Sequence, residues 1–126
     1  MISFDEAGLM LDEIADEIPE DFYRELNGGV VLLPDVKFHP AGGNLYILGE
    51  YNNDRKGYGG LGRYICVYYG SFMRLYSNYT PERQKEELRR ILIHEFTHHI
   101  ESLAGEKGLA VKDADSLEKY KRKYMS

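Results

Sequence analysis

The apolar positions near the N-terminus predict a helix. In "SFDEAGLMLDEIADEIPEDFYREL", residues 3–26, apolar side chains recur near helical spacing at Leu9, Ile14, Ile18 and Phe22. Ser3 is a suitable N-terminal cap, and the "NGG" that follows is a stop signal. We therefore expect a first helix that Pro19 either bends or breaks.

Three apolar runs in the middle of the chain have the composition of strands. They are rich in β-branched and aromatic residues and are bounded by Gly, Asn and Pro. The runs are "GVVLLP" (29–34), "NLYILGEY" (44–51) and "GRYICVYYG" (62–70). We expect three strands that form one small sheet.

The pattern becomes helical again after the third run. "SFMRLYSN" (71–78) predicts a short helix. A long helix then follows, because Thr80 is a suitable cap, Pro81 suits the first helical position and Glu82 lies near the positive end of the helix dipole. We expect this helix to run to Gly105, where the glycine-containing "GEKG" ends it.

The last segment, "DADSLEKYKRKY", begins a final helix capped by Asp113 or Asp115. With this helix the pattern predicts an α+β fold, in which a sheet of about three strands packs on the long helix between an N-terminal and a C-terminal helix. The chain has 126 residues, which is the size of one domain, so residues 1–126 are expected to form a single unit.

Composition and charge exclude several classes of function. The net charge of −5 argues against a nucleic-acid-binding surface, which needs a basic field. The N-terminus lacks a basic start and an apolar signal core, and no stretch approaches the roughly 20 apolar residues of a membrane span. We expect a cytoplasmic monomer that binds neither nucleic acid nor membranes.

The long helix carries three of the four histidines of the chain, in "RRILIHEFTHHIESLAG" (89–105). His94 and His98 are one helical turn apart, so both imidazoles can ligate one Zn²⁺ at about 2.0–2.1 Å. Glu95 then lies beside the metal, where it can take a proton from a zinc-bound water and pass it to a leaving amine. This H-E-x-x-H pattern predicts one zinc per chain, with Glu95 as the catalytic residue.

The other two histidines have simpler interpretations. His99 falls on the apolar face of the helix, where a histidine is more often a packed residue with one hydrogen bond than a metal ligand. His39, in "KFHPAGG", lies in a loop before the second strand, and we expect a surface role for it.

Taken in order, several segments resemble the minimal zincin-like metallopeptidases, which are small bacterial single-domain proteins. The matching segments are "IPEDFYREL" after the first helix, the strands "LGEY" and "RYICVYYGSF", and "LIHEFTHHI". The resemblance implies a zincin core, metal-dependent peptidase chemistry and a peptide or protein substrate that binds along a sheet edge. The chain departs from the family pattern at Glu101 and Ala104, where that family has a glycine and an aspartate.

The third metal ligand is therefore expected from outside the long helix. Glu101 lies on the correct face but about 10.5 Å along the axis from His94, at about 1.5 Å per residue, too far to converge with the pair. We expect Glu101 instead to orient one of the two histidines. The family's ligand aspartate also follows an apolar residue, as in "AVKD", which favours Asp113, with Asp115 as the alternative.

These residues predict a zinc-dependent peptidase of unknown substrate. Two alternatives stay open. One is a repressor-cleaving partner protease of a mobile element, which also uses an H-E-x-x-H helix. The other is a metal-bound protein-interaction module without turnover, whose tyrosine-rich sheet binds a partner.

Overall fold

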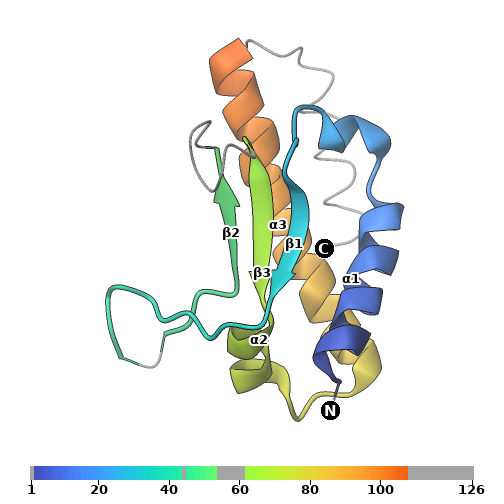
Figure 1. The fold of residues 1–126 in the computed structure, drawn as a ribbon, viewed down its shortest axis with the longest axis vertical. Coiled ribbons are helices and arrows are strands. Elements are labelled where there is room, and N and C mark those ends of the chain that lie inside the picture. Colours follow the sequence, from blue (N-terminus) through green and yellow to red (C-terminus); the bar gives the residue numbers. More distant parts are fainter. Residues whose placement is uncertain (1, 44, 54–61, 108–126) are drawn as a thin grey trace.

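The computed structural model describes residues 2–43, 45–53 and 62–107, which form an α+β fold (Figure 1). In chain order the elements are α1 (Phe4–Glu17), the 3-10 helix η1 (Glu20–Tyr23), β1 (Gly29–Leu33), β2 (Gly49–Asn52), β3 (Tyr64–Tyr68), α2 (Tyr69–Tyr76) and α3 (Pro81–Lys107). The predicted fold class is thus confirmed. The expected C-terminal helix, with Asp113 and Asp115, lies outside the described residues.

Helix α1 begins at the predicted cap and ends before the proline. The Ser3 hydroxyl accepts a hydrogen bond from the Glu6 backbone N–H at 3.1 Å, and the Glu6 carboxylate accepts one from the Ser3 backbone N–H at 3.0 Å. Ile18 adopts an extended conformation, with ψ 131°, because a residue before proline avoids helical dihedral angles. Pro19 therefore breaks the predicted helix, and the chain continues as η1.

The sheet has the strand order β1-β3-β2. Strand β3 is central, parallel to β1 and antiparallel to β2, with Cys66 opposite both Val31 and Glu50. Residues 65–68 of β3 are buried, as expected for a strand with neighbours on both sides. Strand β2 pairs only with β3 in the described part of the chain, so it lies at an edge.

The second predicted strand is divided into two parts. Its first half pairs with residues 37–39: the His39 N–H donates to the Leu45 carbonyl and the Ile47 N–H to the Lys37 carbonyl, both at 2.9 Å. We call residues 37–39 paired with 45–47 the side hairpin. It projects from the sheet, and Gly49–Asn52 is the strand that pairs with β3 (Figure 1).

The third predicted strand is shorter than expected, because α2 already begins at Tyr69. Gly70, where β3 gives way to α2, fits closely against the loop that follows β1. A Cβ atom at Gly70 would lie 2.7 Å from backbone atoms of Pro34 and Asp35. The Ser71 N–H also donates to the Asp35 carbonyl at 3.3 Å, so the loop helps to start the helix where it does.

We expect Gly70→Ala to destabilise the protein by about 1–3 kcal/mol, because the added methyl group meets backbone atoms that cannot rotate away. Urea unfolding would measure the loss of stability. Gly105→Ala is the control, because a Cβ at Gly105 meets nothing within 4 Å. In a helix that substitution should stabilise by about 0.5–1 kcal/mol. Equal effects of the two substitutions would contradict the proposed close fit.

Helix α3 joins the sheet to α1. It contacts β2, β3 and α1, and it crosses behind the sheet with α1 alongside (Figure 1). Its buried apolar side chains are Leu88, Ile91, Leu92, Ile93, Phe96, Ile100 and Leu103. Two ion pairs tie it to α1, Arg89 with Glu17 at 2.8 Å and Lys85 with Glu13 at 2.9 Å. The helix continues past Gly105 to Lys107, two residues beyond the predicted end.

None of the helices within the described residues is both long and apolar enough to cross a membrane.

Candidate metal and catalytic site

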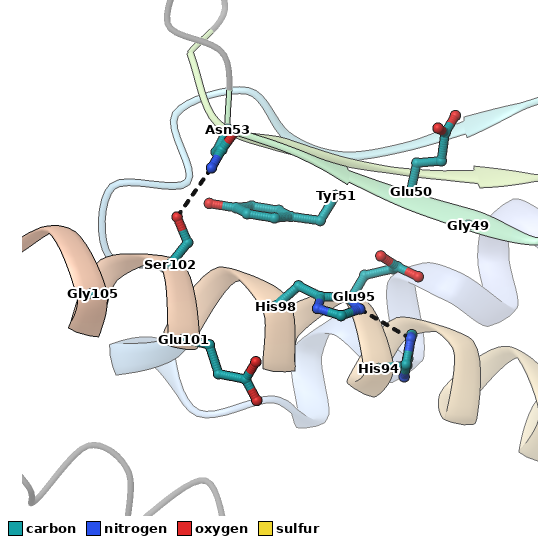
Figure 2. A pocket seen from close by; sticks show the side chains of 10 residues that line it. All are labelled: Gly49, Glu50, Tyr51, Asn53, His94, Glu95, His98, Glu101, Ser102 and Gly105. Carbon is teal, nitrogen blue, oxygen red and sulfur yellow. Dashed lines mark hydrogen bonds between the residues drawn. The ribbon is translucent and has the colours of Figure 1, made fainter.

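The two histidines of the H-E-x-x-H pattern meet on the exposed face of α3. The Nε2 atoms of His94 and His98 are 3.1 Å apart, with the rings nearly perpendicular (Figure 2). This separation is shorter than twice the Zn–N bond length of about 2.0–2.1 Å, so one zinc ion can contact both nitrogens. The pair therefore fits the metal that the sequence predicts.

Glu95 lies beside this pair but is buried, with 6% of its surface exposed. Burial raises the pKa of its carboxyl group to about 7, and the nearby negative charge of Glu50 acts in the same direction. A hydrogen bond from the Tyr51 backbone N–H opposes the rise in pKa. A carboxyl group with a pKa near neutrality can both accept and return a proton, which is what general acid–base catalysis requires.

Gly49 lets strand β2 approach the helix closely at Glu95. A Cβ atom at Gly49 would lie 3.0 Å from Ile91 Cγ2, 3.2 Å from the Cys66 carbonyl oxygen and 3.3 Å from Glu95 Cγ. Contacts this short leave no room for a side chain. The glycine therefore allows β2 to pack closely against the Glu95 side chain.

Tyr51 is held in place by His99, which is fully buried. His99 Nε2 is 2.7 Å from the Arg24 carbonyl oxygen, which can only accept, so this nitrogen carries the proton. In the neutral ring Nδ1 then accepts a hydrogen bond from the Tyr51 hydroxyl at 2.9 Å, and burial lowers the pKa of His99. His99 is thus a packed residue, as predicted, but with two hydrogen-bond partners.

A cavity of about 750 Å³ opens over the histidine pair between α3 and β2 (Figure 2). Its lining is largely polar and consists of Gly49, Glu50, Tyr51, Asn53, His94, Glu95, His98, Glu101, Ser102 and Gly105. Glu50 points away from α3 and accepts hydrogen bonds from Lys37 and Tyr68. The Asn53 side chain donates to the Ser102 hydroxyl at 3.3 Å across the far end of the cavity.

The predicted additional ligands have different positions. Glu101 is exposed and lines the same cavity as His94 and His98, in agreement with its predicted face. His39 is exposed on the side hairpin, where its Nδ1 accepts the Ala41 N–H at 3.0 Å. Within the described ranges, no group of three or more His, Cys, Asp or Glu side chains is arranged to hold a metal ion.

Three contributions to the site were not predicted from the sequence. These are Gly49 as the point of close approach, Tyr51 as a backbone donor to Glu95, and Glu50 as a negative charge that raises the pKa of Glu95. Alternation along "LGEY" could have placed Gly49 and Tyr51 on one face of the strand. It does not indicate that this face meets Glu95.

A solved structure resembles this chain, and the resemblance covers the whole of that other chain. It is described as a conserved hypothetical protein from Thermus thermophilus, and the two chains are 34% identical. The alignment covers 83% of this chain and 100% of the other, with a TM-score of 0.72. No protein-family model matches the chain, and no curated protein matches it. At this identity and coverage, the chain belongs to the same family as the Thermus thermophilus protein.

Proposed function

We propose that the protein is a zinc-dependent peptidase. The observation that carries this proposal is the pair of imidazole nitrogens 3.1 Å apart next to a buried carboxyl group in an open cavity. His94 and His98 would hold the ion, which when bound lowers the pKa of a water molecule to about 7. The substrate would be a peptide or a protein.

The part of Glu95 in this reaction is proton transfer. The carboxylate would take the proton from the attacking water and return it to the leaving amine. The Tyr51 N–H would hold the carboxyl group in position, and the absence of a side chain at Gly49 lets β2 pack against the Glu95 side chain. Strand β2 thus helps to position the Glu95 carboxyl group.

The edge of β2 offers a place for the substrate backbone. The Tyr68 N–H donates to the Leu48 carbonyl at 2.9 Å, so in the alternating antiparallel pattern Gly49 and Tyr51 direct their backbone groups away from β3. Both residues line the cavity. Because the Tyr51 N–H donates to Glu95, Gly49 is the residue of this edge that we propose for pairing with a substrate. An extended peptide could add to this edge as a further strand, which favours the predicted sheet-edge binding.

The third ligand can be identified by zinc affinity. We expect Asp113→Ala to weaken zinc binding more than Asp115→Ala or Glu101→Ala, because catalytic zinc sites take three protein ligands and the third must approach from off the helix. Loss of an orienting partner should cost about 10–100-fold in affinity, and loss of a ligand more. Competition with a chromogenic chelator would measure each constant. If Glu101→Ala alone strips the metal, α3 supplies all three ligands.

Digestion of a broad peptide library tests the function itself. The zinc-loaded protein should cleave peptides, a chelator should stop cleavage, and added zinc should restore it. Mass spectrometry of the products would locate the cuts. Bound zinc without any cleavage would instead favour the metal-bound interaction module, and a cut confined to a repressor protein would favour the mobile-element protease.

A further inference from the structure

The cavity over the histidine pair continues into a second cavity of about 500 Å³. The two share Gly49, His94 and Glu95, so the proposed reacting groups lie at their junction. Ligand pockets commonly occupy about 300–1,000 Å³, so the second cavity is large enough for a bulky side chain.

The second cavity differs from the first in its chemistry. Most of its lining surface is apolar, from Tyr46, Ile47, Leu48, Tyr76 and Ile91, although two imidazoles, those of His39 and the shared His94, also line it. Besides Glu95, two charged residues line it, Glu87 and Arg90. These two form an ion pair with each other at 3.7 Å. Because these two charges compensate each other, and because His94 and Glu95 lie at the junction with the first cavity, a bound side chain would meet mainly the apolar surface.

The two cavities follow one another along the cleft. Strand β2 and helix α3 run in the same direction (Figure 1), and the second cavity takes the earlier residues of both segments. From these two segments it takes side chains within residues 46–48 and 87–91, whereas the first cavity takes side chains within residues 50–53 and 98–105. An extended peptide that crosses Glu95 would place neighbouring residues in cavities of opposite polarity.

We infer that the second cavity binds a large apolar side chain of the substrate, that of a residue next to the cleaved bond. The protein would then cut beside residues such as Phe, Leu or Met, while the residue across the cut lies in the polar cavity. This inference rests on the proposed peptidase function and adds the class of substrate to it.

Ile47 is a suitable residue for a test. It lines the second cavity from the side hairpin and does not belong to the core cluster, so Ile47→Asp should place a carboxylate in the cavity without unfolding the protein. Leu45→Asp is the matched control. Leu45 lies on the same hairpin and is 57% exposed, and it lines neither cavity.

The experiment uses two peptide pools that are random except for Phe or Ala at the central position. Cleavage at the central residue gives the ratio of kcat/KM for Phe over Ala, and fluorescence anisotropy with the zinc-loaded Glu95→Gln protein gives the ratio of affinities without turnover. We expect both ratios to be at least about 10–200 for the native cavity, since apolar pockets discriminate single methylene groups on that scale. Leu45→Asp should keep the ratios, and Ile47→Asp should bring them close to 1.

The outcomes separate this inference from the peptidase proposal. Selective binding of the Phe pool that Ile47→Asp abolishes, without any cleavage, would support the apolar cavity and refute the peptidase. Cleavage with no preference for Phe, or with a preference that Ile47→Asp leaves intact, would refute the cavity and support the peptidase. Absence of both cleavage and selective binding would overturn both.

Discussion

The Glu95→Gln protein should keep its zinc and lose at least about 10²–10⁴-fold of its peptidase activity, because general-base catalysis contributes that much. Glutamine keeps the size of the side chain and can still accept the Tyr51 N–H, but it cannot take up the proton of the attacking water. Zinc content by mass spectrometry and turnover of a peptide found in the library digest are the two measurements.

Glu86→Gln is the matched control for this substitution. Glu86 is exposed on the same helix and lines neither cavity, so the same chemical change there should leave turnover within a factor of about two. If Glu95→Gln turned over peptides at the native rate, Glu95 would have no part in the mechanism. A parallel loss of zinc would mean that its carboxylate contributes to metal binding.

The second large effect concerns the metal. We expect about one zinc per chain in protein purified without chelators, and almost none in His94→Ala or His98→Ala, because a single imidazole from α3 cannot replace the pair. Metal analysis of each purified variant would measure the stoichiometry, and circular dichroism would show whether the variants remain folded.

His39→Ala tests the other exposed histidine, which lies on the side hairpin and lines the second cavity together with His94 and Glu95. It should retain the native zinc content. Loss of zinc in that variant would make His39 the third ligand. Full zinc in both the His94 and the His98 variant would place the metal elsewhere in the molecule.

Local sequence signals were sufficient for most of the helices. Ser3 and Thr80 both cap as predicted, with the Thr80 hydroxyl accepting the Arg83 N–H at 3.3 Å. The four-residue spacing of His94 and His98 was sufficient to bring them together, because helical geometry alone places such residues one turn apart. Helical periodicity also placed His99 on the apolar face of the helix, and His99 is buried.

The strands were predicted less well, because pairing is not a local property. The run at residues 44–51 reads as one strand, yet its first part pairs with residues 37–39 and its second with β3. Apolar alternation is the same in either partnership, so the sequence does not show where one ends and the other begins.

What the sequence by itself determined is the α+β composition, the first residues of α1 and α3 and the presence of His94, Glu95 and His98 along one helix. Only the tertiary structure decided that Gly49 and Tyr51 meet Glu95, that burial raises its pKa to about 7 and that a polar and an apolar cavity join there. The physical reason is that burial and cavity shape depend on contacts between segments more than 40 residues apart in the chain, such as Tyr51 and His99. Such contacts leave no periodic or spacing signal in either segment alone.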